Sequence, residues 1–311
     1  MKTMNSLHNP VLLNESIKYL SIKPNGIYID CTCGRGGHTN KILSCLNDEG
    51  KIICLDTDKQ AYDYLLKKYQ NNINVILVND NFKNIKMILN KLNISKVDGI
   101  IADLGVSSPM FDDAERGFSY HQNARLDMRM NQDDLLDAYK VINEYDAKEL
   151  TRIFKQYGEV SNPRRIVNAI IFTRKNHAIE TTDELVNIIK NNVNKKELFK
   201  SKHPARVYFQ AIRIEVNHEL DNLKKLLSDG TNLLNKDGRM VIITFHSLED
   251  RIVKQFFNNI TITHIPKEVP IMNTATDFEL LTKKPVVASQ EEVKLNNRAR
   301  SAKLRCLRRY N

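Results

Sequence analysis

Three glycines within four positions, Gly34, Gly36 and Gly37, form the part of the sequence best suited to binding a ligand. The whole chain has only 11 glycines, so this cluster indicates a special backbone or the close approach of a ligand. An apolar run ending at Asp30 precedes the cluster, and Asp56 ends the next apolar run. An acid after the second strand typically binds a ribose diol. The pattern therefore predicts a nucleoside-binding site.

The spacing within the glycine cluster separates the candidate nucleosides. A dinucleotide fingerprint requires a third glycine, whereas Thr39 stands near that place, and no Gly-Lys-Ser/Thr sequence follows that would indicate a P-loop. The pattern is closer to the S-adenosylmethionine loop of class I methyltransferases. A dehydrogenase is therefore the weakest interpretation, and a glycine-rich turn without a ligand is the structural alternative.

The cysteines and the apolar runs exclude several other classes of protein. Cys31 and Cys33 form only C-x-C with no second pair downstream, so we expect no metal site. None of the five cysteines follows a proline, which argues against a cytosine C5 methyltransferase. The odd cysteine count favours a reduced interior. No run approaches the ~18 apolar residues of a membrane span, and the first ten residues lack a secretory signal, so we expect a cytoplasmic protein with no membrane partner.

Short apolar runs alternate with helix-length segments and define the elements that must position these residues. Continuous apolar runs indicate strands buried on both faces, and hence a parallel sheet. Strands are predicted at 27–29, 52–55, 75–78, 99–102 and 240–245, and helices at 39–46, 59–69 and 84–92. The predicted fold class is therefore α/β, with a Rossmann-like parallel sheet.

The separation between the fourth and fifth predicted strands indicates an insertion. A βαβ unit needs ~30 residues, and more than a hundred separate Asp103 from Met240. Helical periodicity and capping signals run through 110–205, which we interpret as an all-α insertion of four or five helices. The segment 207–234 is predicted to be the crossover helix that returns to the fifth strand. The predicted domains are thus 1–109 with 206–311, and the inserted 110–205.

Positive charge is concentrated at the end of the chain. The formal net charge is +10, and residues 283–311 carry nine basic and two acidic side chains. Taken alone, such a segment is a solvated basic tail. Beside a nucleoside-binding sheet, it is better interpreted as part of a surface that faces a polyanion.

Six motifs in order resemble the bacterial ribosomal RNA small subunit methyltransferase H family, also called the MraW family. The resemblance extends from about His8 to Arg305. The motifs are GRGGH at 34–38, DLGVSSP at 103–109, DDAERGFS at 112–119, LDMRM at 126–130, FHSLEDR at 245–251 and RARS at 298–301.

This resemblance implies a class I methyltransferase sheet interrupted by a helical domain. It implies transfer of a methyl group from S-adenosyl-L-methionine to N4 of a cytidine in 16S rRNA, at position 1402 in the usual bacterial numbering. The 16S rRNA or the small ribosomal subunit is then the partner. The implied cofactor contacts are Gly36, Gly37, His38, Asp56, Phe82 and Asp103. Met110 stands where the family commonly has Gln, so it is not included.

Several of these residues have two interpretations. Asp103 is the candidate catalytic residue, either as the acceptor for the target amine or only as a contact to the cofactor. Phe82 either flanks the adenine or belongs to the core. His38 is expected to act more through its backbone than its ring. His246 either caps the following helix or shapes the pocket for the target base.

The sequence also leaves open the roles of several arginines and the function of the whole chain. Two roles are open for three arginines, Arg116, Arg129 and Arg165. They either bind RNA phosphate or pair with nearby acids, and ion pairing is the commoner role of an arginine. Methylation of another nucleic acid is the second functional interpretation, and a non-catalytic RNA-binding or assembly factor is the third. A homodimer is an alternative to a monomer.

Overall fold

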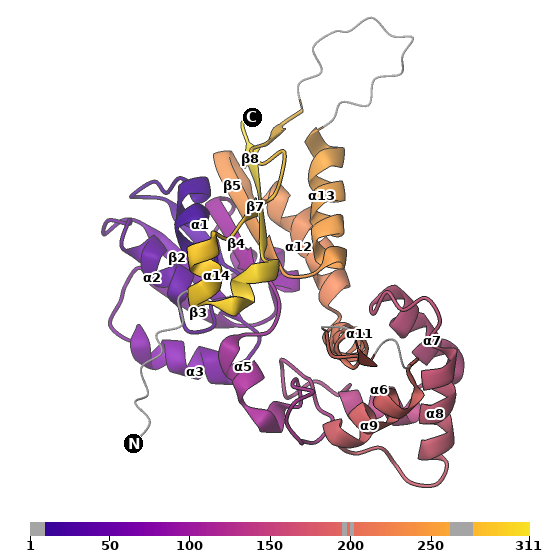
Figure 1. The fold of residues 1–311 in the computed structure, drawn as a ribbon. Helices are drawn as coiled ribbons and strands as arrows, with labels where there is room; N and C mark the ends of the chain where they lie inside the picture. The colour runs from indigo at the N-terminus through magenta and orange to yellow at the C-terminus, as the bar shows by residue number, and fades with distance from the viewer. Residues whose placement is uncertain (1–9, 195–197, 200–201, 262–275) are drawn as a thin grey trace, which may run out of the picture. The chain divides into compact units, whose positions relative to one another are not determined.

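The computed structural model describes residues 10–194, 198–199, 202–261 and 276–311 (Figure 1). The chain divides into two compact units. The first, here called the sheet unit, comprises Met1–Gly105 and Leu220–Asn311. The second, the helical unit, is Val106–Glu219. No helix in these described ranges has the length and apolar character needed to cross a membrane.

The sheet unit is built on one mainly parallel sheet whose strand order is β3-β2-β1-β4-β5-β8-β6, with β7 paired to β8. Neighbouring strands from β3 to β5 run parallel, and β8 runs antiparallel to β5, β6 and β7. The strands are β1 (Ile27–Asp30), β2 (Lys51–Asp56), β3 (Val75–Asn79), β4 (Val97–Asp103), β5 (Leu234–Thr244), β6 (Phe278–Leu280), β7 (Val286–Val287) and β8 (Lys303–Arg309). The five parallel strands are those that the apolar runs predict, although β5 begins earlier than expected. The observed fold is thus of the predicted α/β class.

Helices cover both faces of this sheet because successive strand residues point to opposite sides. Ile53, Ile100 and Ile242 pack on one face, against α4 (Ile85–Lys91), α12 (Glu219–Asn232) and α13 (Ser247–Thr261). Ile52, Ile101 and Val241 pack on the other. The helices there are α1 (Leu13–Leu20), α2 (Gly37–Leu43) and α3 (Lys59–Lys68). Figure 1 shows this layered arrangement.

The helical unit has its own apolar core. Its helices are α5 (Ser108–Asp112), α6 (Ala138–Glu144), α7 (Ala147–Gln156), α8 (Arg164–Arg174), α9 (Thr182–Asn192) and α11 (Arg206–Asn217). Capping boxes start two of them, with Asp146 and Glu149 at α7, and Thr181 and Glu184 at α9. The capping signal that predicts a helix after 181 is therefore confirmed.

The prediction of a single crossover helix at 207–234 is wrong in one respect, because the segment forms two helices. His218 has a left-handed φ of 51° and separates α11 from α12. The side chains of α11 pack in the core of the helical unit, whereas α12 packs on the sheet. The compact helical unit therefore extends to Glu219, beyond the domain bound expected at 205.

The basic end of the chain is folded rather than a free tail. The elements there are β7, α14 (Gln290–Leu295), the 3-10 helix η3 (Asn297–Ser301) and β8. Arg305 is buried and its Nε lies 2.7 Å from Oδ1 of Asp250, while Lys303 Nζ lies 3.1 Å from Oδ2 of the same carboxylate. Two of the nine basic side chains expected to face a polyanion are thus paired within the sheet unit.

Candidate functional site

The loop between β1 and α2 uses its glycines for backbone shape and close packing. Gly34 and Gly36 have left-handed φ angles of 51° and 76°. A Cβ on Gly36 would lie 2.6 Å from the hydroxyl of Tyr69, and one on Gly37 would lie 2.2 Å from Cγ of Pro10. Side chains at these positions would therefore displace the loop, whatever ligand it binds.

Asp56 ties this loop to the second strand. One carboxylate oxygen accepts the backbone N–H of Gly34 at 2.7 Å, and the other accepts that of Asp58 at 2.9 Å. Burial raises the pKa of Asp56 to about 6, partly offset by these two hydrogen bonds. The sequence predicts Asp56 as a ribose contact, and the structure shows in addition a direct bond from the loop to this carboxylate.

Asp30, at the end of β1, is a site residue that the sequence analysis missed. It is 1% exposed, and its carboxylate accepts the Thr39 hydroxyl at 2.7 Å and the Thr32 N–H at 3.2 Å. Burial raises the pKa of Asp30. The available signal was its position, because an acid that ends the strand before the loop lies at the same sheet edge as Asp56 and Asp103.

Asp103, at the end of β4, is held by its backbone and leaves one carboxylate oxygen unpaired. Its N–H donates to the hydroxyl of Thr32 at 2.7 Å. Its Oδ1 is buried and has no hydrogen-bond partner among the described residues. Burial raises the pKa of Asp103 well above its usual range, and the charges of Asp30 and Glu249 raise it further. A buried acceptor without a hydrogen-bond partner destabilises the folded protein unless a ligand donates a hydrogen bond to it.

His38, in the first turn of α2, joins the N-terminal segment to this sheet edge. Its Nε2 lies 3.1 Å from the carbonyl oxygen of Val11 and donates to it, so Nδ1 is the unprotonated nitrogen. That Nδ1 lies 4.0 Å from Oδ2 of Asp103. Burial lowers the pKa of His38, which favours the neutral ring. The structure therefore gives the ring itself a positioning role that the backbone interpretation did not include.

Phe82 and Met110 lie in different environments. Phe82 begins the 3-10 helix η1 (Phe82–Asn84) after β3 and packs partly buried against the apolar face that α4, α12 and α13 cover. Its contact with an adenine stays a prediction. Met110 is buried in the core of the helical unit, with an exposed fraction of 5%, so an apolar side chain suits that position.

The end of α3 holds the glycine loop from its outer side. Lys68 Nζ donates to the carbonyl oxygen of Arg35 at 2.9 Å, and the Tyr69 hydroxyl donates to that of Gly36 at 3.4 Å. The guanidinium of Arg35 lies 4.4 Å from the ring centroid of Tyr64. We call Tyr64, Lys68 and Tyr69 the loop clamp.

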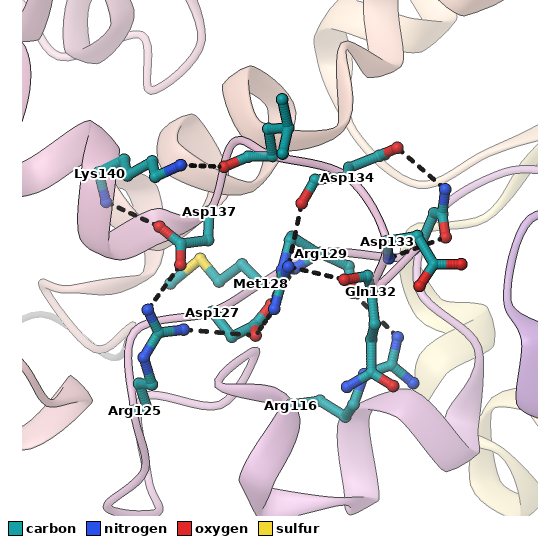
Figure 2. A network of polar contacts seen from close by, with 12 residues as sticks. Arg116, Arg125, Asp127, Met128, Arg129, Gln132, Asp133, Asp134, Asp137 and Lys140 are labelled. Atoms are coloured by element: carbon teal, nitrogen blue, oxygen red, sulfur yellow. Dashed lines mark hydrogen bonds and ion pairs between the residues drawn. The ribbon is translucent and has the colours of Figure 1, made fainter.

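Two arginines of the helical-unit motifs serve the protein's own structure (Figure 2). Arg116 is 2% exposed and donates from Nη2 to the carbonyl oxygens of Arg129 and Met130, both at 2.9 Å. Arg129 binds both carboxylate oxygens of Asp127, at 2.8 and 2.7 Å. Ion pairing is therefore the role that the structure shows for Arg129. Arg165 is exposed on α8.

His246 lies at the start of α13, where its contacts are those of a helix cap. Its Nδ1 accepts the Glu249 N–H at 3.4 Å, and Oε2 of Glu249 accepts the N–H groups of Phe245 and His246 at 2.8 and 3.2 Å. Between the two open interpretations, these bonds support the cap.

The cysteines beside the glycine loop lie in surroundings that disfavour the thiolate. Cys31 and Cys33 are buried free thiols. Burial raises the pKa of both thiols well above the usual value, so they stay protonated at neutral pH.

The sheet edge therefore gathers three carboxylates, from Asp30, Asp56 and Asp103. The charge of Asp30 raises the pKa of the other two. Such an edge suits a ligand that brings positive charge and hydroxyl or amine donors.

The sequence is similar to one known family over almost its whole length. The model of the MraW methylase family matches residues 5–310. The ribosomal RNA small subunit methyltransferase H of Ureaplasma urealyticum is 51% identical over 300 residues, which cover 96% of this chain and 97% of that protein. The protein of the same name from Malacoplasma penetrans is 48% identical, with both chains fully covered.

Among solved structures, an rRNA methylase from Streptococcus thermophilus matches with a TM-score of 0.39 and 12% identity. The match covers 96% of this chain and 95% of that one. The family model and the curated relatives extend over almost the whole chain. The chain belongs to the MraW methylase family.

Proposed function

We propose that this protein methylates N4 of a cytidine in 16S rRNA, at the position that the family resemblance implies. Its relatives are named as small-subunit ribosomal RNA methyltransferases, and the family resemblance implies S-adenosylmethionine as the methyl donor. The observation that carries the proposal is the buried, unpartnered Oδ1 of Asp103 at the sheet edge. Because the rRNA is made and assembled in the cytoplasm, we place the protein there.

The donor-binding residues follow from the chemistry of the sheet edge. Asp56 is the acceptor for the ribose hydroxyls, and Gly36, Gly37 and His38 form the loop beside it. Phe82 is the candidate neighbour of the adenine. The three carboxylates complement the sulfonium and ammonium charges of the donor, because a cation there would relieve their mutual repulsion.

Asp103 is the residue that we assign to the reacting amine. The lone pair of N4 is delocalised into the cytosine ring, so a hydrogen bond from N4–H to Oδ1 would help to turn it toward the methyl group. S-adenosylmethionine supplies an electrophilic methyl group when bound. As the N–C bond forms and the S–C bond breaks, N4 becomes positively charged and loses one proton. The raised pKa of Asp103 suits it to accept that proton.

Asp103→Asn tests this assignment, because it removes the charge while preserving the shape. At saturating S-adenosylmethionine we expect methyl transfer to fall by at least about 100-fold. Affinity for S-adenosylmethionine should fall as well, because the substitution neutralises one of the three carboxylates that complement its charge. The substrate is the small subunit from cells that lack this gene, and mass spectrometry of its rRNA locates the methyl group. Asp237→Asn, at an exposed position of β5, is the matched control. Wild-type turnover in Asp103→Asn would contradict the assignment.

The same assay separates the alternatives. Naked rRNA, assembled subunits and DNA are compared as substrates, and methylation of DNA alone would favour the second functional interpretation. A protein that binds rRNA but not S-adenosylmethionine would be an assembly factor. No observation in the described part of the chain supports the homodimer, and the proposal leaves it out.

A further inference from the structure

The helical unit carries a cluster of aromatic rings that the proposed chemistry does not use. The rings of Tyr120 and His203 are stacked, with centroids 4.9 Å apart and planes 14° apart. His121 meets His203 edge-on at 5.6 Å, and Tyr120 meets Phe209 edge-on at 5.7 Å. We call Tyr120, His121 and His203 the ring platform; Phe209 is buried beneath it.

The platform faces outward at one end. His121 is exposed, and Tyr120 and His203 are half-buried, so the cluster runs from the core to the surface. Exposed aromatic rings that pack on one another offer a flat apolar surface, which water solvates poorly. A planar ligand could extend such a stack.

The segment that carries His121 is fixed by hydrogen bonds. The Ser119 hydroxyl accepts the N–H of His121 at 3.2 Å. The Thr182 hydroxyl donates to the carbonyl oxygen of Gln122 at 2.7 Å and accepts the N–H of Ala124 at 3.1 Å. On the opposite side, Nδ1 of His203 accepts the N–H of Ala205 at 3.2 Å. A ligand would therefore meet rings that are already in place, which lowers the entropic cost of binding.

Basic residues stand close to the ring platform in the sequence. Lys202 and Arg206 flank His203 along the chain, and both are exposed. Burial lowers the pKa of His203, and the charges of Lys190, on α9, and of His121 lower it further. Aromatic rings for stacking together with lysine and arginine for the backbone are the combination by which proteins bind unpaired RNA.

We propose that the ring platform stacks an unpaired base of the substrate RNA, and that the neighbouring basic side chains bind its phosphates. This inference rests on the proposed function, because it names a contact of the same rRNA substrate. Stacking tolerates any base, so the platform contributes affinity rather than sequence selection.

His121→Ala and His121→Phe test the platform, because alanine removes the ring and phenylalanine keeps it. Affinity for the small-subunit rRNA is measured by filter binding, together with the KM and kcat of methylation. We expect His121→Ala to weaken RNA binding about 5- to 100-fold. It should raise the KM for RNA and leave kcat and affinity for S-adenosylmethionine unchanged. His121→Phe should restore binding.

His177→Ala is the matched control, because His177 is an exposed histidine of the same unit and takes part in none of the platform's ring contacts. Equal RNA affinity of His121→Ala and wild type would overturn the platform while leaving the proposed function intact. A loss that phenylalanine does not restore would overturn stacking, and so would a loss seen with assembled subunits but not with naked rRNA. Failure of the wild-type protein to bind or methylate rRNA would overturn the proposed function and, with it, the platform.

Discussion

Two groups of aspartates in this protein have opposite electrostatic environments. At the sheet edge, Asp56 and Asp103 have raised pKa values, caused first by burial. In the helical unit, Asp127 pairs with both Arg129 and Arg125, and Arg125 also binds Asp137 at 2.7 Å (Figure 2). There the hydrogen bonds and charge of Arg129 outweigh burial, and the pKa of Asp127 is lowered.

The opposite pKa shifts distinguish a candidate ligand-binding site from a network of structural ion pairs. A carboxylate that is paired with guanidinium groups has its interactions completed by the fold, so it stabilises the folded state. A buried carboxylate without such a partner costs free energy in the free protein, and a cationic ligand can recover that energy. Asp103 and Asp127 both lie in motifs that carry the family resemblance, so the motifs alone do not separate the two roles.

Unfolding of two matched variants should give the largest effect. Asp127→Asn leaves Arg125 and Arg129 without their shared carboxylate, and we expect a loss on the order of 3 kcal/mol in the free energy of unfolding. Asp103→Asn removes an unpaired charge, so the free energy of unfolding should stay equal or rise. Urea denaturation of both variants and wild type at pH 7 measures this. If Asp103→Asn were the less stable variant, the comparison would fail.

The pH dependence of stability should show the same contrast with a smaller effect. The folded pKa of Asp56, about 6, lies above the unfolded value of about 3.9, so the folded state binds the proton more tightly. This group therefore adds stability as pH falls through 6, and that contribution is lost as pH rises. Asp127 has the reverse sign, because its lowered pKa gives stability above the unfolded value that is lost as pH falls through the folded one.

Asp56→Asn isolates the first of these contributions. The difference in the free energy of unfolding between this variant and wild type is measured by urea denaturation at pH 7 and at pH 4.5. We expect it to shift by up to about 2 kcal/mol in favour of wild type at the lower pH. A difference that does not change with pH would show that the Asp56 carboxylate is not destabilised by burial.

The sequence was sufficient for the parallel strands and for the acids that end them, because apolar runs and strand-end acids are local signals. It did not predict the bond from the Gly34 N–H to Asp56. It was not sufficient for Asp30, whose role depends on Thr32 and Thr39 lying on either side of it in space. Nor was the break at His218 predicted, since the apolar pattern continues through it. Charge counting also failed for Arg305, because partners distant in sequence decide whether a basic residue faces solvent.

The loop clamp gives the last and smallest prediction, and it bears on how the sheet edge is held. Lys68→Met should remove one hydrogen bond to the carbonyl oxygen of Arg35 without altering the carboxylates. One such bond contributes about 1 kcal/mol, so affinity for S-adenosylmethionine should fall about 3- to 10-fold. The KM for S-adenosylmethionine should rise by the same factor, with kcat unchanged.

Lys67→Met, at the exposed neighbouring position, is the control and should bind as wild type does. An equal loss in both variants would mean that general positive charge, rather than the bond to the loop, affects binding. A fall in kcat for Lys68→Met alone would mean that the clamp acts on the reacting groups rather than on binding of S-adenosylmethionine.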